Sequence, residues 1–215
     1  MEFENITISE LLKETSSKSP TPGGGSITAL TGALSTALAS MVCNITLNNK
    51  EYESVYDIVK GLLKKLNNLQ IQLLDAAQND TEYFNELMIT KALPKDTLEE
   101  KNLRKNRLYE SYKDLVMVSI NIARIAVEIL PILAVLIKDG NKSVITDIII
   151  AAMLARTTAL SAIVNARYNL RYVSDDNYVK IIMEECNVLE DYAIDQEAYV
   201  AAIEPSLTNI YLYTK

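Results

Sequence analysis

The sequence predicts an all-α fold, a single-domain multi-helix bundle over residues 1–215 with a central buried helix of small residues, in a dimeric assembly. Apolar residues recur at helical spacing along the whole chain, and no segment alternates apolar and polar residues as a half-buried strand does. Capping motifs precede two of the predicted helices. A length of 215 residues suits one domain that buries a sizeable core.

The first two predicted helices are a short capped helix and a helix of small residues. Thr7-Ile8-Ser9-Glu10 fits a capping box, in which the Thr and Glu side chains satisfy backbone N–H groups at the helix start. A longer helix is expected from Ile27 to Thr46. One of its faces carries the small residues Ala29, Gly32, Ala33, Thr36, Ala37 and Ser40. Small side chains let another helix approach closely, so this helix is expected at the centre of a bundle or dimer.

The rest of the chain continues the helical pattern, giving about seven helices in all. Residues from Glu51 to about Leu93 are expected to form one or two helices, and a second capping box opens the helix Thr97 to Asp139. The last two predicted helices run from Ser143 to about Val173 and from Asn177 to about Ala202.

The composition limits which partners and which cellular location we expect for the protein. The formal net charge of −7 argues against nucleic acid as a partner. Cys43 and Cys186 form no CxxC pair and no secretory leader is visible, so we expect reduced thiols in a cytoplasmic protein. The apolar runs Leu115 to Ile137 and Val144 to Ala166 carry internal charges, each costing about 2.5 to 3.5 kcal/mol in a membrane. We therefore expect buried bundle helices and no membrane partner.

The chain contains no histidine. This removes the usual general base at neutral pH, the commonest zinc ligand, and every Ser-His or Cys-His nucleophile system. Any chemistry must use Asp, Glu, Lys, Tyr, Ser or backbone groups, and no metal site is expected.

The loop Pro20-Thr21-Pro22-Gly23-Gly24-Gly25-Ser26 is a candidate binding site. Glycines allow positive φ and close backbone approach, and Ser26 is a favoured N-cap residue at the positive end of a helix dipole. An ordinary turn before a helix is an equally good interpretation of the glycine spacing alone. Nucleotide binding is not predicted, because neither a Gly-Lys-Ser/Thr ending nor a GxGxxG register after a strand is present.

Further along the chain, marked stretches follow one another in a particular order. They are Thr21-Pro22-Gly23-Gly24-Gly25-Ser26, Ala39-Ser40-Met41-Val42, Asp80-Thr81-Glu82-Tyr83-Phe84, Leu93-Pro94-Lys95 through Lys101 with Arg104, Gly140-Asn141, Thr146-Asp147, and Asn165-Ala166-Arg167-Tyr168-Asn169-Leu170. Together they resemble the cyclodeaminase/cyclohydrolase family, meaning the formiminotetrahydrofolate cyclodeaminase domain and the stand-alone methenyltetrahydrofolate cyclohydrolases. The resemblance covers residues from about 3 to 190.

The chain departs from the family pattern at three places. The chain has Thr146-Asp147 where the family usually has Ser-Asp, and Ser119 where the family usually has Pro. The stretch Asn165–Leu170 replaces the usual Asn-Val-x-Ile-Asn-Leu. Asp147, Asn165 and Asn169 are retained, which favours the same fold and ligand class.

The resemblance implies a helical dimer that binds a tetrahydrofolate derivative as its substrate near the subunit interface, with no other cofactor. Relatives close 5-formiminotetrahydrofolate to 5,10-methenyltetrahydrofolate with loss of ammonia, or hydrolyse the methenyl ring to 10-formyltetrahydrofolate. Both activities stay open here, and a separately encoded formiminotransferase is a candidate partner. A non-catalytic folate-binding protein is the alternative from a different class.

Within that pattern, Asp147 and Asp80 are the candidate catalytic residues. Asp147 lies in the first turn of its predicted helix and could stabilise an amidinium cation, although a helix-start Asp also stabilises its own helix dipole. Asp80 is a candidate general acid or base, and outside the family pattern it would be a solvated surface residue.

Substrate binding is assigned to Gly23, Gly24, Gly25 and Ser26 of the loop, with Asn165, Asn169 and Lys95. The two Asn side chains share a helix face and could bind a pterin edge or make a polar contact between helices. Asp147 and Asn165 are five turns apart, about 27 Å on a straight helix. Either the helix breaks, one end binds the distal part of folate, or two subunits share each site.

Lys95 belongs to a cluster of cations around Pro94. The others are Lys101, Arg104, Lys105 and Arg107. The cluster could bind the anionic glutamate tail of folate, or it could be the solvated face of a helix.

Overall fold

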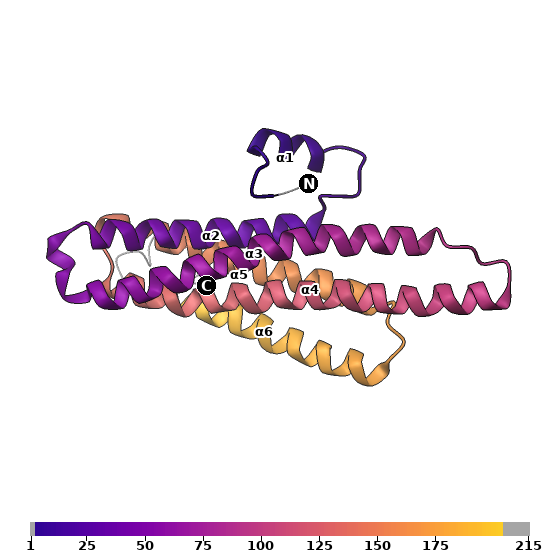
Figure 1. Ribbon diagram of the computed structural model, residues 1–215. Coiled ribbons are helices and arrows are strands. Elements are labelled where there is room, and N and C mark those ends of the chain that lie inside the picture. Colours follow the sequence, from indigo (N-terminus) through magenta and orange to yellow (C-terminus); the bar gives the residue numbers. More distant parts are fainter. Residues whose placement is uncertain (1–2, 204–215) are drawn as a thin grey trace.

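A computed structural model describes residues 3–203, and these form six α-helices and two short 3₁₀ helices with no strand. In chain order they are α1 Ile8–Thr15, α2 Gly24–Leu47, η1 Lys50–Val55, α3 Tyr56–Lys91, α4 Leu98–Asp139, η2 Lys142–Val144, α5 Ile145–Leu170 and α6 Asp176–Ala202 (Figure 1). The all-helical prediction is confirmed. The tail Ser206–Lys215, for which the sequence analysis makes no assignment, lies outside the described residues.

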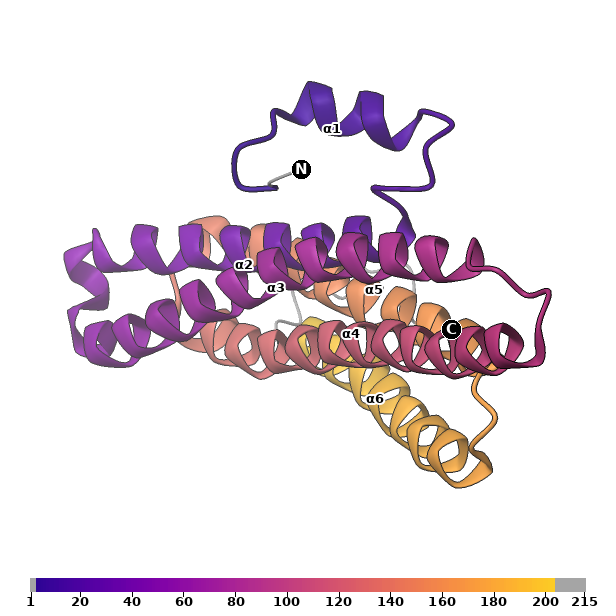
Figure 2. The same cartoon turned by 45° about the vertical axis from the view of Figure 1, so that its right-hand side comes forward.

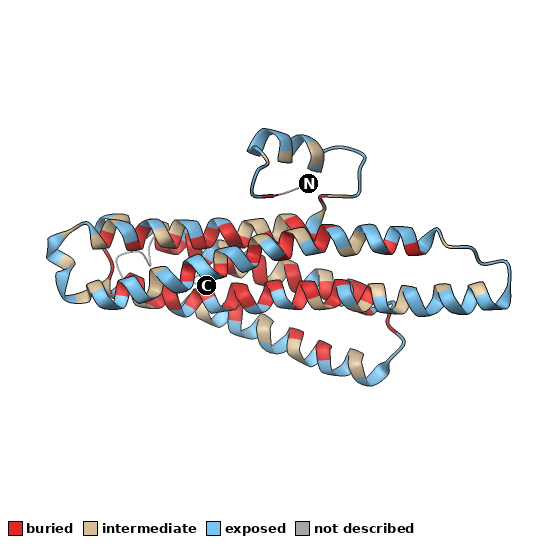
Figure 3. Cartoon of the chain, viewed as in Figure 1, coloured by how far each residue is buried: buried red, intermediate tan, exposed pale blue. Residues whose placement is uncertain are grey.

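Four long helices, α2 to α5, form an antiparallel bundle. Helix α2 packs on α3 and α5, and α4 packs on the same two helices from the other side. Helix α6 crosses the outside of α4 and α5, while α1 stands off from the bundle beside the start of α2 (Figures 1 and 2). Buried residues concentrate along the middle of the bundle, where the long helices face one another (Figure 3).

Both predicted capping boxes form. The Thr7 hydroxyl accepts from the Glu10 N–H at the start of α1, and Thr97 and Glu100 make the same arrangement at the start of α4. The helix expected from Glu51 begins instead at Tyr56. Its first residues form the 3₁₀ segment η1, which the Asn49 side chain caps by accepting from the Glu51 N–H.

The small residues of α2 are used within one chain. A Cβ at Gly32 would lie 3.0 Å from Thr158 Cγ2 and 3.1 Å from Leu73 Cδ1, so α5 and α3 both approach the backbone there. Ser35 Oγ also donates a 2.7 Å hydrogen bond to the Ala151 carbonyl. The other side of α2 is exposed, with Leu34 63% accessible. A central position for α2 would require a second chain on that side.

Three segments are long and apolar enough, judged by length and composition alone, to cross a membrane. They are Gly24–Leu47, Leu98–Asp139 and Lys142–Leu170. In the bundle, half to two thirds of the most apolar stretch of each segment is buried against other helices. The last two contain the runs that the sequence analysis assigns to buried helices.

Candidate functional site

The glycine loop lies directly against Asp80. A Cβ added to Gly25 would lie only 2.0 Å from Asp80 Oδ1 and 2.4 Å from its carboxyl carbon, so only glycine leaves room for this side chain. None of the glycines has a positive φ. The expected conformational reason for the glycines is therefore wrong, and close approach is the reason at Gly25. Gly24 is exposed, and a Cβ there would meet open space.

Ser26 is not the N-cap that the sequence suggests. Helix α2 begins at Gly24 with Gly23 as its N-cap, which places Ser26 inside the first turn and fully buried. Its hydroxyl donates a 2.8 Å hydrogen bond to Asp80 Oδ2 and lies 2.9 Å from the Thr81 hydroxyl. The backbone N–H of Ser26 also hydrogen-bonds to Asp80. The anionic group at this helix start is thus a side chain of the same chain.

Asp80 is buried, with 6% of its surface accessible, so its interpretation as a solvated surface residue is wrong. Burial raises the pKa of Asp80, and the hydrogen bonds from Ser26 oppose that rise only in part. A carboxylate whose pKa is raised is a stronger base than an exposed carboxylate, and it accepts a proton more readily. The geometry therefore suits general acid–base chemistry at this position.

Asn165 lies at the same level of the bundle as Asp80. Gly32 faces both Leu73 of α3 and Thr158 of α5. Helix α2 runs antiparallel to α3 and α5, so a step toward the start of α2 corresponds to a step toward the ends of α3 and α5. Seven residues, or about two turns, in that direction lead from Gly32, Leu73 and Thr158 to Gly25, Asp80 and Asn165.

The Asn165 side chain reaches helix α4. Its Nδ2 donates a 3.2 Å hydrogen bond to Ser119 Oγ, the position where the family usually has Pro. This is the polar contact between helices offered above as an alternative. Asn165 is half-buried, and Asn169, one turn further along α5, is buried.

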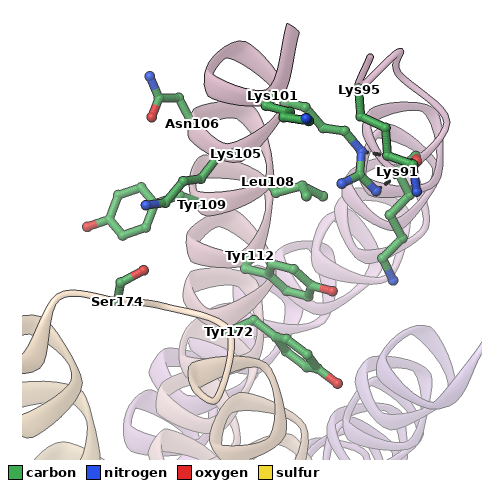
Figure 4. Close-up of a pocket in the computed structure, with 11 residues that line it drawn as sticks. Lys91, Lys95, Lys101, Lys105, Asn106, Leu108, Tyr109, Tyr112, Tyr172 and Ser174 are labelled. Atoms are coloured by element: carbon green, nitrogen blue, oxygen red, sulfur yellow. Dashed lines mark hydrogen bonds between the residues drawn. The ribbon is translucent and has the colours of Figure 1, made fainter. Parts of the chain in front are cut away.

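A cavity of about 730 Å³ opens at the end of the bundle where α3 turns into α4 (Figure 4). Five cationic side chains line it, namely Lys91, Lys95, Lys101, Arg104 and Lys105, together with Tyr109, Tyr112 and Tyr172. The cationic cluster predicted around Pro94 is thus the wall of a cavity. Arg107 does not line it and faces a separate acidic groove with Glu86, Glu110 and Asp114.

Two tyrosines that sequence reasoning missed form the aromatic part of this cavity. The rings of Tyr112 and Tyr172 stack with their centroids 4.5 Å apart, and Lys91 Nζ lies 5.6 Å from the Tyr112 ring. Tyr112 precedes Ser119 by seven residues and Tyr172 follows Asn165 by seven. That spacing places both rings about 10 Å along the bundle from the Asn165–Ser119 contact, and it is the signal that could have found them.

Asp147 lies far from this group of residues within one chain. Helix α5 is continuous from Ile145 to Leu170, so the helix break considered above does not occur. The half-buried Asp147 therefore stays about 27 Å along the helix from Asn165. The structure brings Gly25, Ser26 and Asp80 into contact, with Asn165 at the same level of the bundle. The cavity lined by Lys95 lies beyond them, and Asp147 lies at the opposite end.

Comparison with known proteins gives consistent matches. The family model described as formiminotransferase-cyclodeaminase matches residues 7–188. A methenyltetrahydrofolate cyclohydrolase from Methylorubrum extorquens is 32% identical over 197 residues, covering 91% of this chain and 95% of that protein. A formimidoyltransferase-cyclodeaminase from Sus scrofa is 30% identical over 189 residues, covering 88% of this chain and 35% of that protein. The crystal structure of a formiminotetrahydrofolate cyclodeaminase from Thermotoga maritima superimposes with a TM-score of 0.85 at 26% identity, covering 95% of this chain and 98% of that one.

Proposed function

The chain belongs to the formiminotransferase-cyclodeaminase family, and on that premise we propose that it is an enzyme acting on one-carbon tetrahydrofolates. The reaction is either closure of 5-formiminotetrahydrofolate to 5,10-methenyltetrahydrofolate with loss of ammonia, or hydrolysis of the methenyl ring to 10-formyltetrahydrofolate. The observation that carries the proposal is the buried Asp80 carboxyl, held against Gly25 at the same end of the bundle as a cationic cavity.

Asp80 has a proton-transfer role in either reaction. In ring closure, the folate N10 attacks the carbon of the protonated formimino group and passes its own proton to Asp80. Asp80 then gives that proton to the amino group, and the C–N bond breaks to release ammonia and leave the methenyl cation. In hydrolysis, Asp80 accepts a proton from the water that attacks the methenyl carbon, and N5 receives that proton when its bond to the carbon breaks. The second proton of the water is released to solvent as the formyl C=O forms. The raised pKa of Asp80 supports both steps, because one group must accept and release the same proton.

The cavity supports an orientation for the substrate. The one-carbon unit and pterin would lie near Asp80 and Asn165, and the rest of folate would extend past Tyr112 and Tyr172 toward the lysines. The stacked rings offer an aromatic surface, and Lys95 with its neighbours offers positive charge to the glutamate carboxylates. The separation of about two turns between the two regions agrees with a ligand that has a ring at one end and anions at the other.

A homodimer is part of the proposal. Helices α2 and α5 lie side by side and expose large apolar side chains, namely Leu34, Met41, Ile150, Met153 and Val164. Val164, for example, is 66% accessible. Exposed apolar residues that follow one face of two adjacent helices are typical of an interface between chains.

A dimer through this face would also complete the site. Arg156 lies midway between Asp147 and Asn165 on α5, and the exposed apolar residues of α5 run from Ile150 to Val164. A two-fold axis passing near the level of Arg156 brings the partner subunit's Asp147 to the level of Asn165. Two chains would then share each site, with Asp80 from one and an anion for the amidinium cation from the other.

The remaining parts of the proposal concern context. A separately encoded formiminotransferase is the proposed partner that would supply 5-formiminotetrahydrofolate, and the region matched in the Sus scrofa protein is about a third of that protein. We place the chain in the cytoplasm, as its buried Cys43 and Cys186 are free thiols.

A paired assay tests the proposed function. Purified protein is given 5-formiminotetrahydrofolate and 5,10-methenyltetrahydrofolate separately, and both reactions are followed through the absorbance of the methenyl compound. Turnover of at least one substrate is expected. Binding of both without turnover would instead identify a non-catalytic folate-binding protein.

A further inference from the structure

The immediate surroundings of Asp80 are hydroxyl groups rather than charges. Ser26 has one hydroxyl proton and donates it to Asp80 Oδ2 at 2.8 Å. The 2.9 Å contact between Ser26 and Thr81 then has Thr81 as its donor, which gives a chain from Thr81 through Ser26 to Asp80. All three side chains are buried. Gly25, Ser119 and Asn165, which lie at the same level, carry no titratable group, and burial and the hydrogen bonds from Ser26 are the causes that shift the pKa of Asp80.

We propose that Ser26 and Thr81 are positioning residues for Asp80, which hold its Oδ2 atom and stay paired with it in both of its protonation states. This inference rests on the proposed function, in which Asp80 is the general acid and base. Oδ1 fills the space that Gly25 leaves by lacking a side chain. One carboxyl oxygen is therefore held by hydroxyls, and the other packs against the glycine loop.

The hydroxyl chain can satisfy both protonation states of Asp80. When the carboxylate is ionised, Thr81 donates to Ser26 and Ser26 donates to Oδ2. When Oδ2 carries a proton, that proton is donated to Ser26 Oγ, and the Ser26 hydroxyl turns to donate to Thr81. Each hydroxyl keeps its own proton and only rotates. A buried polar group without a hydrogen-bond partner lowers stability. Because the hydroxyl chain can donate either toward Asp80 or away from it, Asp80 can gain and lose a proton while every buried hydroxyl keeps a partner.

The Ser26 backbone N–H makes the two states unequal. It can only donate, so it favours the ionised carboxylate, as does the stronger hydrogen bond that a hydroxyl makes to a charged acceptor. Burial acts in the opposite direction. Loss of the Ser26 hydroxyl removes one interaction that favours ionisation, whereas its backbone N–H remains.

The test measures kcat and KM from pH 4 to 9 for the substrate that the wild-type enzyme turns over, in Ser26→Ala, Thr81→Val and Thr81→Ser. In the plot of kcat against pH, the rise or fall that is absent in Asp80→Asn is assigned to the titration of Asp80, and is called the Asp80 limb. In Ser26→Ala that limb moves to higher pH by about one unit, because a hydrogen bond to a charged group is lost. The direction is the same whether the active form of Asp80 is ionised or protonated. KM changes less than kcat.

The Thr81 pair keeps the test valid if Ser26→Ala does not fold. Thr81→Val shifts the limb upward by less than Ser26→Ala, and Thr81→Ser, which keeps the hydroxyl, restores the wild-type limb. Thr158→Val is the matched control, because it also removes a buried threonine hydroxyl. That hydroxyl donates to the Leu154 carbonyl and lies about two turns along the bundle from the level of Asp80. An unshifted limb in both Ser26→Ala and Thr81→Val, or an equal shift in Thr158→Val, would overturn the proposal.

A second readout separates this proposal from the proposed function. The Asp80 carboxyl carbon is titrated by ¹³C nuclear magnetic resonance, with Asp80→Asn used to assign the signal. If the wild type turns over neither folate, the proposed function fails, yet an upward pKa shift in Ser26→Ala would still support the hydroxyl chain. An unchanged titration would refute it independently of activity.

Discussion

The two ends of the bundle use polar residues in different ways. At the end where α4 turns into α5, the hydrogen bonds close the turn: the Asn141 side chain accepts from the Ser143 N–H, and Thr46 Oγ1 accepts from the Asn141 N–H. At the other end, Ser26, Thr81 and Asp80 bond to one another in the interior, across two helices.

The difference supports the proposal that proton transfer takes place at the Asp80 end. The polar groups at the α4–α5 turn are used to satisfy the local backbone, and within residues 3–203 no hydrogen bond or ion pair joins Asp147 to another side chain. The Asp80 end has a buried carboxyl and, about 10 Å further, an aromatic and cationic cavity. In the proposed mechanism, the Asp147 end takes part in catalysis only if a second chain brings it to an Asp80 end.

The largest expected effect is at Gly25. Gly25→Val forces a side chain into the volume of the Asp80 carboxyl, so Asp80 must move, and turnover should fall by about 10²- to 10⁴-fold with an added loss of stability of about 1 to 3 kcal/mol. Steady-state kinetics and urea unfolding measure the two losses. Gly61→Ala is the control, since a Cβ there meets open space in the exposed side of α3. Wild-type turnover in Gly25→Val would contradict the close packing described here.

Asp80→Asn should separate activity from stability. Turnover should fall by about 10²- to 10⁴-fold while substrate affinity changes little. An acid whose pKa is raised by folding stabilises the folded state below its unfolded pKa, and that contribution is lost as pH rises through the folded pKa. At neutral pH the buried carboxylate therefore destabilises the protein.

The melting temperature of Asp80→Asn should accordingly exceed that of the wild type at pH 7. The difference should shrink as pH falls through the folded pKa of Asp80 and should be smallest below about 3.9, the usual pKa of Asp. Thermal melts recorded by circular dichroism at several pH values measure it. A lower melting temperature at pH 7 would show that the hydrogen bonds of Asp80 outweigh the cost of its burial.

A smaller effect is expected in the cationic cavity. Lys95 is exposed, so Lys95→Ala should raise KM by about two- to five-fold and leave kcat unchanged, and added salt should reduce the difference. Lys180→Ala on α6, outside the cavity, is the matched control. A change in kcat rather than in KM would assign Lys95 to the chemical step.

The sequence alone predicts the helices well because local signals determine them. The capping boxes at Thr7 and Thr97 and the stop at Asp139 depend on residues within a single turn. The site was only partly predictable, because its geometry comes from contacts distant in sequence. Gly25 and Asp80 are both named from the sequence, yet their contact depends on how α2 packs on α3.

The same limit explains the errors at Ser26 and at the tyrosines. A serine after three glycines resembles an N-cap, but the helix starts earlier because Gly23 takes that place and Asp80 takes the serine hydroxyl. Tyr112 lies in α4 and Tyr172 in the turn that follows α5, and each alone has the pattern of an ordinary surface or core residue.

A mixed-dimer experiment tests most directly the claim that two chains share each site. Asp80→Asn and Asp147→Asn chains carrying different affinity tags are refolded together, and the heterodimers are isolated. If each site takes Asp80 from one chain and Asp147 from the partner, one of the two sites in every heterodimer is intact, and activity returns to about half of the wild-type value per dimer. Heterodimers as inactive as the two parent variants would contradict the shared site.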